Sequence, residues 1–484
     1  MKDNRWGFFP GVSVGWNVTE EDFWKESKIS EVISNIKPRL SYGVNGNVNG
    51  IGNFDIYGIY KQIGAGNYDG ATAYYNSSLI NTGLRWEQSR SFEAGLDLGF
   101  FNNRLSFIFD YYNRTTDDLL TDVNLPAYTG FSSMKTNLGK LRNSGFEMEV
   151  RANILSNAKG FNWEVSANLT SVSNKVLKLP TSDKPFNQID GYEVAAGLYN
   201  PETGETPTKW IGGYREGGKL GDMVGYVQNH IFRDWNDVKA NANMVIDEVA
   251  NLYGPGMANE INPQTGVTYA ESNGWKPIEP GDVCWEDINK DGKINSLDRA
   301  VVGNIFPKVT GGFSTTLSYK NWSLYARFDY ALGHTIYNDL KARSLGQYQG
   351  QFNIIDKVHD TWSETNPDTD LPVFTYADQL NKKNITRSNN GNTAVDNNSS
   401  RFYEKGDYLA LREITLSYSL PKKWIGKAGM QDASVYVTGQ NLFYITGYDG
   451  VSPEPAVSTV YGRGIDNGRY PTPRTLLFGL SVTF

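Results

Sequence analysis

The sequence lacks the residues from which most metal and covalent sites are built. Its 484 residues include one cysteine, Cys284, and three widely separated histidines, His230, His334 and His359. A single cysteine cannot form an internal disulfide, and zinc sites need clustered cysteine or histidine ligands. We therefore expect neither a disulfide-stabilised fold nor a zinc site, and no motif in the chain points to an enzyme.

The chain also lacks long apolar runs and an excess of positive charge. No stretch of about 18 consecutive apolar residues is present, so no transmembrane helix is predicted. The net charge is -7, and no basic patch is evident that could neutralise the phosphates of a nucleic acid. Outer-membrane β-barrels escape a hydropathy test, because their strands alternate apolar and polar residues and look hydrophilic on average.

Aromatic residues and period-two patterns are what the sequence does contain. Aromatic residues make up 13% of the chain, and about eleven segments alternate as half-buried strands do. Each is near the ~10 residues that a tilted strand needs to cross a bilayer. They lie at 6–17, 37–46, 90–99, 104–113, 144–152, 160–173, 311–320, 321–331, 408–420, 433–443 and 474–484.

Two C-terminal segments show the alternation most clearly. In the last one, the apolar face consists of Leu476, Phe478, Leu480, Val482 and Phe484. In segment 408–420, one face is predicted to carry Tyr408, Ala410, Ile414, Leu416, Tyr418 and Leu420, interrupted by Arg412. The opposite face of that segment begins with Leu409 and Leu411 and then turns polar.

The connections between these segments alternate between long and short. The long connections are 47–89, 114–143, 174–310, 332–407 and 444–472, and the short ones are 100–103, 153–159, 320–321 and 421–430. Residues 18–36 resemble a short amphipathic helix within a further turn. An up-and-down barrel has short periplasmic turns and long outer loops, whereas a soluble sandwich has no reason to keep its long loops at one end. The pattern therefore predicts an all-β, antiparallel transmembrane β-barrel.

Several stretches resemble the SusC/RagA family of TonB-dependent transporters of Bacteroidetes outer membranes, in order and over the whole chain. They are NRWGFFPGVSVGW (4–16), IKPRLSYGVNGN (36–47), the long stretch 84–120 that begins LRWEQSRSFEAGLDLGFF, NLGKLRNSGFEMEV (137–150), the stretch 284–314 that begins CWEDINKDGKINSLDRA, RFYEKGDYLALREITLSYSLP (401–421), GQNLFYITGYDGVSPE (439–454) and YPTPRTLLFGLSVTF (470–484).

The resemblance implies a larger protein than this sequence. Family members are roughly twice as long, and their barrels of about 22 strands surround a plug. We therefore expect residues 1–484 to be the C-terminal part of a β-barrel domain, about eleven strands with long extracellular loops. The signal peptide, the N-terminal extension and the plug are not visible in this sequence. An open sheet with two unpaired edges is not expected to survive alone in lipid.

The resemblance also implies a function and partners. It implies uptake of oligosaccharides, or of peptides, across the outer membrane with a SusD-like surface lipoprotein, and contact with TonB through the part outside this sequence. No covalent chemistry is implied. Two other classes stay open: a secreted, soluble β-rich glycan-binding protein or adhesin with a structural calcium loop, and a glycan-degrading enzyme that uses paired carboxylates.

An oxygen-rich loop in the longest connection has the ligand spacing of a calcium site. In DINKDGKINSLD (287–298), side-chain oxygens would come from Asp287, Asn289, Asp291 and Asp298, and a backbone carbonyl from Lys293. The flanks are not helical, so the loop is not an EF-hand sensor, and bound Ca²⁺ would be weak and structural. The alternative is a metal-free turn held by its own side-chain hydrogen bonds.

Aromatic residues in the long connections are the candidate ligand contacts, because flat rings stack on sugar faces. They are Tyr57, Tyr60, Tyr68, Tyr74, Tyr75, Trp210, Tyr214, Trp235 and Trp275. The alternative role for each is to pack the loops or to join the aromatic girdle at the membrane interface. Phe484 is predicted to act as a C-terminal assembly signal, because outer-membrane barrels commonly end in an aromatic residue.

Overall fold

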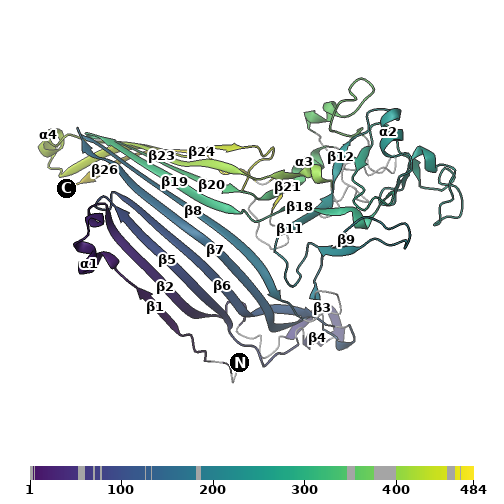
Figure 1. Cartoon of the computed structure of the whole chain (residues 1–484), viewed down its shortest axis with the longest axis horizontal. Helices are drawn as coiled ribbons and strands as arrows, with labels where there is room; N and C mark the ends of the chain where they lie inside the picture. Colours follow the sequence, from purple (N-terminus) through teal and green to yellow (C-terminus); the bar gives the residue numbers. More distant parts are fainter. Residues whose placement is uncertain are drawn as a thin grey trace.

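An antiparallel sheet forms the body of the molecule (Figure 1). The computed structural model describes residues 4, 6–52, 60–68, 71–76, 79–125, 127–131, 133–180, 187–345, 355–374, 399–454, 464–468 and 470–484. In this described part the sheet has eleven strands, in the order β1-β2-β5-β6-β7-β8-β19-β20-β23-β24-β26. Their bounds are Gly11–Gly15, Ile33–Asn47, Glu87–Phe100, Leu105–Asn124, Ser133–Ala158, Phe161–Lys178, Val309–Tyr319, Trp322–Leu332, Tyr408–Ser419, Asp432–Thr446 and Thr475–Thr483. Each predicted segment corresponds to one of these strands.

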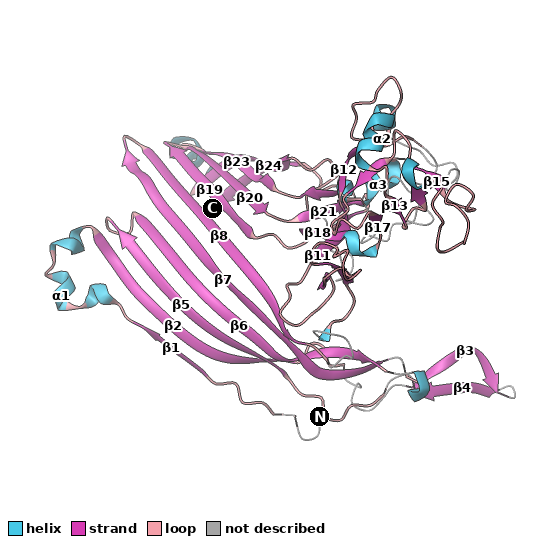
Figure 2. Ribbon diagram, turned by 45° about the vertical axis from the view of Figure 1, so that its right-hand side comes forward, coloured by secondary structure: helices cyan, strands magenta, loops and turns pink. Residues whose placement is uncertain are grey.

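The two ends of the sheet differ as the loop lengths predict. One end carries the tight turns, with the short helices α1 (Asp22–Lys25) and α4 (Lys422–Ile425). The described parts of the long connections lie at the other end, where those from 179–308, 333–407 and 447–474 fold into a separate mass of structure and the β3–β4 hairpin stands apart from it (Figures 1 and 2). The prediction of an all-β antiparallel fold with one-sided long loops is confirmed.

The ladder register shows that the sheet has one apolar and one polar face. Directly opposed residues of neighbouring strands share a face, and the next row along the strands lies on the other. One row of the apolar face consists of Val150, Ala167, Phe313, Phe328 and Leu411. The adjacent row, on the polar face, consists of Arg151, Ser166, Ser314, Arg327 and Glu413.

The apolar face ends in a row of aromatic rings beside the tight turns. This row consists of Phe161, Tyr319, Trp322 and Tyr418. The rings pack in pairs, with centroids 4.1 Å apart for Phe161–Tyr319 and 4.7 Å apart for Trp322–Tyr418. From Val309 to Tyr319, β19 is about 34 Å long, or roughly 26 Å along the barrel axis at the usual tilt of about 40°. That height matches the apolar band of an outer-membrane barrel.

The buried core lies in the loops and not on the sheet. On the apolar face Leu416 is 45% exposed and Phe478 is 78% exposed. The buried clusters instead centre on loop residues such as Phe232, Val238 and Tyr337. A protein whose sheet presents its apolar side chains outward is the inverse of a soluble sandwich, in which both sheets bury that face.

We call the folded long connections, within 179–308, 333–407 and 447–474, the loop domain. Its strands are β9 (Tyr192–Ala195), β10 (Thr208–Ile211), β11 (Asp222–Tyr226), β12 (Gln228–Ile231), β13 (Ile246–Asp247), β14 (Leu252–Tyr253), β15 (Lys276–Pro277), β16 (Val283–Trp285), β17 (Lys293–Ile294), β18 (Arg299–Asn304), β21 (Thr335–Asn338), β22 (Tyr403–Lys405) and β25 (Ile465–Asp466). Its helices are α2 (Trp235–Asn241) and α3 (Asp339–Ser344). Within the described ranges, no helix has the length and apolar character to cross a membrane.

The three parts of the loop domain are joined by direct contacts. Strand β21 pairs with β22 and, in parallel, with β25, which comes from the last long connection. The Tyr403 hydroxyl donates to the carbonyl of Val224 at 3.0 Å, and Tyr226 forms an isolated parallel β-bridge with Ser399. The loop domain is therefore a single packed unit above the sheet.

Three expectations need correction. In β23 an extra residue, Arg412, forms a β-bulge against β20. Because a bulge shifts the alternation by one residue, Leu409 and Leu411 share the apolar face with Ile414, and Tyr408 and Ala410 lie on the polar face.

The other two corrections concern connections. Much of 114–143 continues as strand, because β6 and β7 extend past the apolar band as a paired ribbon. No buried face imposes alternation there, so the sequence carries no strand signal. Residues 18–36 contain α1 between two short 3₁₀ turns, Val18–Glu20 and Lys28–Glu31, in place of one amphipathic helix.

Strands β3 (Tyr60–Tyr68) and β4 (Ala71–Asn76) form a hairpin in the first long connection.

A glycine–tyrosine pair on the polar face gives a test of the register. Gly145 of β7 lies opposite Tyr112 of β6, and a Cβ at Gly145 would meet the Ser171 carbonyl at 2.1 Å and the Tyr112 hydroxyl at 2.9 Å. We expect Gly145→Ala to lower the free energy of unfolding by about 1–3 kcal/mol, the usual cost of overpacking. Urea unfolding of the full-length protein in lipid vesicles measures the loss.

Gly43→Ala is the matched control. Gly43 lies on the same face, and the nearest atom to its added Cβ is 4.0 Å away. We expect that variant to retain or slightly gain stability, because alanine reduces the entropy of the unfolded chain. Equal stability of the two variants would contradict the register described above.

Candidate functional site

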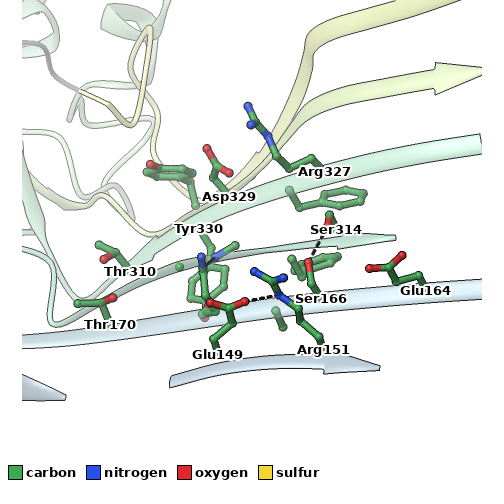
Figure 3. Close-up of a pocket in the computed structure, with 17 residues that line it drawn as sticks. Glu149, Arg151, Glu164, Ser166, Thr170, Thr310, Ser314, Arg327, Asp329 and Tyr330 are labelled. Atoms are coloured by element: carbon green, nitrogen blue, oxygen red, sulfur yellow. Dashed lines mark hydrogen bonds and ion pairs between the residues drawn. The ribbon is translucent and has the colours of Figure 1, made fainter. Parts of the chain in front are cut away.

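A cavity of about 710 Å³ lies against the polar face of the sheet (Figure 3). Its lining comes from β7, β8, β19 and β20, with Tyr408 at the start of β23. Gly312 sits between Asn168 and Asp329 in one ladder row. The Gly312 N–H donates to Asn168 Oδ1 at 2.6 Å, and a Cβ at Gly312 would meet the Phe328 carbonyl at 2.7 Å.

The cavity is lined by charges of both signs. Glu149 accepts a hydrogen bond from the Arg151 guanidinium on the same strand (Figure 3). Asp329 accepts one from Arg412 Nε at 2.9 Å. Ser166 and Ser314 share a hydrogen bond of 2.8 Å between their hydroxyls across β8 and β19. Such a wall offers mainly polar and ionic contacts.

Because of the bulge, the side chain of Arg412 points toward the segment of the loop domain that follows β24. The guanidinium donates from Nη2 to the Glu454 carboxylate and from Nη1 to the Tyr444 hydroxyl at 3.1 Å. The Tyr444 hydroxyl in turn donates to Glu454 Oε2 at 3.1 Å. We call Arg412, Asp329, Tyr444 and Glu454 the clasp, because they connect the wall of the cavity to the segment after β24.

The clasp was not identified from the sequence. Arg412 was noticed only as an interruption of an apolar face, which is the signal that could have revealed a bulge. No residue near Glu454 in the sequence indicates its role, because its partner Arg412 lies 42 residues earlier, on β23. Within the clasp, the side chains of Arg412 and Glu454 are 14% and 27% exposed, so the charge-assisted hydrogen bond between them is only partly screened by solvent, whereas Asp329 is 42% exposed.

The described members of the nine aromatic residues predicted to contact ligand do not converge on the cavity. Tyr60, Tyr74 and Tyr75 are exposed on the β3–β4 hairpin. Tyr57 lies outside the described residues, and Tyr68 is the last residue of β3, with its side chain outside the described part. Of the seven whose side chains the structure describes, none lines the cavity, and ligand contact of all nine stays a prediction.

The other four lie in the loop domain. Trp210 donates its indole N–H to the Asp190 carbonyl at 2.8 Å, and Tyr214 forms an isolated antiparallel β-bridge with Ile189 through its backbone. Trp235 begins α2 and is exposed, whereas Trp275 is buried against Tyr269 with centroids 5.0 Å apart. The surroundings of Trp275 are those of a packing residue, so it is the one of the four whose ring has least surface free for a ligand.

The predicted calcium loop is a compact turn that uses its own side chains. Asp287 Oδ2 accepts from the N–H of Gly292 at 2.8 Å, and Asp291 Oδ1 from that of Lys293 at 2.7 Å. Asp298 accepts from the N–H groups of Ile288 and Asn295, at 2.9 and 2.8 Å. Ile294 is buried beneath the loop, as its position in the motif predicts.

The charges of the loop bear on whether a cation fits. Burial, together with smaller contributions from the charges of Asp287 and Asp291, raises the pKa of Asp298 to about 6. The donor set is all oxygen, as Ca²⁺ prefers. Among the described residues, however, no three carboxylate, histidine or cysteine side chains converge as a metal site requires. Ca²⁺ would therefore have to draw the carboxylates of the loop together as it binds, and Ca²⁺ binding stays a prediction. The role of Lys293, through its carbonyl, stays one too.

Phe484 follows the last strand and is exposed. It continues the apolar face formed by Leu476, Phe478, Leu480 and Val482. Its role as an assembly signal stays a prediction.

The two-faced sheet, the one-sided loops and the polar cavity define the wall of an outer-membrane-type β-barrel. Comparison with known proteins agrees. Residues 2–215 match the family described as TonB dependent receptor-like, beta-barrel. All of the chain aligns with TonB-dependent receptor P3 of Formosa agariphila at 30% identity, covering 42% of that protein. It aligns with TonB-dependent receptor SusC of Bacteroides thetaiotaomicron at 29% identity, covering 40%.

A solved structure shows the same fold. The structure of the RagAB peptide transporter matches all of this chain and 44% of its own, with a TM-score of 0.68 and 23% identity. The chain spans about two fifths of the length of the curated relatives that it matches. The resemblance to the SusC/RagA type is confirmed: residues 2–215 match the TonB-dependent receptor β-barrel family, and the whole chain is similar to part of these receptors. The assignment of all of 1–484 to that one domain stays a prediction.

The clasp predicts local opening of the segment after β24. We expect Glu454→Gln to speed amide hydrogen exchange of residues 447–454 roughly tenfold or more, because it weakens charge-assisted hydrogen bonds that contribute about 1.5–3 kcal/mol. Exchange mass spectrometry of the full-length protein measures it. Glu20→Gln, which breaks the exposed pair with Lys25, is the control and should leave these amides unchanged. Unchanged exchange in Glu454→Gln would show that the clasp does not hold the segment.

Calcium addition tests the predicted loop site. With Ca²⁺ at ten times its dissociation constant, we expect a stabilisation of about 1.4 kcal/mol, seen as a higher melting temperature. The increase should disappear in Asp291→Asn and should be smaller with Mg²⁺, which demands octahedral geometry. A melting temperature that does not respond to millimolar Ca²⁺ would leave the loop as a metal-free turn.

Proposed function

We propose that this chain forms the C-terminal part of the barrel of a TonB-dependent outer-membrane transporter that imports oligosaccharides or peptides. The observation that carries the proposal is the two-faced sheet, whose apolar side chains point outward while its polar face holds the cavity. In a membrane, the first face contacts lipid and the second lines the passage.

The apolar face disfavours the soluble alternative, a secreted glycan-binding protein or adhesin. Burying one large apolar side chain contributes about 1.5–3 kcal/mol, and this face exposes many of them together. A contiguous apolar surface of that kind marks a membrane or protein contact. The aromatic row Phe161, Tyr319, Trp322 and Tyr418 fits the interfacial girdle of such a barrel.

The edges of the sheet support a larger barrel. In the described part of the chain, β1 and β26 are the end strands and each pairs on one side only. Unpaired backbone N–H and C=O groups in hydrocarbon each cost several kcal/mol. We infer that strands outside this sequence pair with both edges and close a barrel of about 22 strands around a plug.

The ligand and partners follow from the relatives. One relative is named SusC, and one fold neighbour is a peptide transporter. We propose an oligosaccharide ligand, with a peptide as the alternative, a SusD-like lipoprotein over the loop domain, and TonB contact through the part of the transporter outside this sequence. The packed loop domain offers a firm platform for such a lipoprotein.

Cell fractionation tests this function. Cells of the source organism are separated into soluble, inner-membrane and outer-membrane fractions, and an antibody against residues 470–484 detects the protein. We expect a band well above 54.1 kDa, confined to the outer membrane and shifted by heating. Deletion of the gene should abolish depletion of one ligand class from the medium. A 54.1 kDa band in the soluble fraction would refute the proposal.

A further inference from the structure

We propose that Arg327 and Ser314 form a subsite in the cavity that binds a carboxylate of the transported ligand. This inference rests on the proposed function and adds a chemical property of the ligand to it. The ligand is then an acidic oligosaccharide or a peptide, and not a neutral sugar chain.

The first argument is the pairing of charges around the cavity. Arg151 is engaged by Glu149, and Asp329 by Arg412 of the clasp. Over the part of the chain that the structure describes, the side chain of Arg327 takes part in no ion pair or hydrogen bond, and it is exposed. A guanidinium with five free donors on a cavity wall is suited to bind a carboxylate with two parallel hydrogen bonds.

The second argument is the row in which Arg327 stands. Ser314 lies directly opposite it on β19, and Ser166 lies opposite Ser314 on β8 (Figure 3). Either hydroxyl can be the donor in this pair, so Ser314 can accept from Ser166 and keep its own hydrogen for a ligand. Opposed side chains have Cβ atoms about 4.5–5.5 Å apart, so one carboxylate can contact both Arg327 and Ser314.

Neighbouring carboxylates restrict the ligand further. Glu413 lies opposite Arg327 on β23 and accepts a hydrogen bond from Thr415 at 3.1 Å. Glu164 lies two residues before Ser166 on β8 and faces the same cavity. These charges repel a second anionic group placed beside the first. The subsite therefore favours a ligand with an isolated carboxylate over a polyanionic chain.

Binding of matched probes to the full-length transporter tests the subsite. The first pair is an oligosaccharide that ends in one glucuronate and its neutral counterpart. The second pair is a peptide with a free C-terminal carboxylate and the same peptide as an amide. Isothermal titration calorimetry measures each affinity. We expect the charged member of one pair to bind at least about tenfold more tightly, and the pair that shows this identifies the source of the carboxylate.

Variants connect that preference to Arg327. Arg327→Gln should remove the roughly tenfold or larger preference, and Arg327→Lys should keep part of it, because the charge remains but the planar fork does not. Glu413→Gln should increase affinity for the charged probe. Arg90→Gln, which removes an arginine paired with Asp117, is the matched control and should change nothing. Thermal melting checks that each variant is folded.

Three results would overturn the subsite. They are equal affinity for charged and neutral probes, a preference that survives Arg327→Gln, and no binding of either charged probe at millimolar concentration. In each case, outer-membrane location and ligand depletion still test the transporter itself, so failure of the subsite is distinct from failure of the proposed function.

Discussion

Backbone hydrogen bonding between long antiparallel strands is the constraint on which the structure depends. In hydrocarbon, each N–H and C=O group needs a partner, and a continuous sheet supplies these from strand to strand. The ladder from β2 to β24 does so over strands of 11 to 26 residues. Once the backbone is satisfied in this way, side chains alternate by geometry, and one face can be apolar while the other is polar.

Because of this division, the sheet and the loops place their apolar side chains in opposite ways. The sheet points its apolar residues outward, and the loop domain buries its own, as in the cluster around Phe232 and Val238. The cavity lies on the polar face, and its lining reaches Tyr408, the first residue of β23 after the loop domain. The clasp at Arg412 joins the two regions, since it pairs with Asp329 on the wall and Glu454 beyond β24.

The strands could be predicted because a half-buried strand imposes a period of two on its own residues. All eleven segments were found in this way, and the tight turns between them followed. Where no face is buried, as in the outer parts of β6 and β7, alternation fades and the strand was predicted as a loop. The bulge at Arg412 inverted the predicted faces of Tyr408 and Ala410, because one extra residue reverses the alternation.

The candidate site was harder to predict than the fold. The cavity is formed by Arg151, Ser166, Ser314 and Arg327, which are unremarkable in sequence and meet only through the register of four strands. Motif and composition pointed instead to the loop at 287–298 and to loop aromatics. A local motif can reveal a local turn, but a site assembled across a sheet has no local signature.

Spin-label accessibility in lipid vesicles tests the two-faced wall most directly. Nitroxide labels are placed at Phe313→Cys and at Ser314→Cys in the full-length transporter with Cys284→Ala, since Cys284 is the sole cysteine of this chain. The account predicts that the label at 313 collides mainly with oxygen dissolved in the lipid, and the label at 314 mainly with a water-soluble nickel complex. Equal access of the nickel complex to both labels would contradict it.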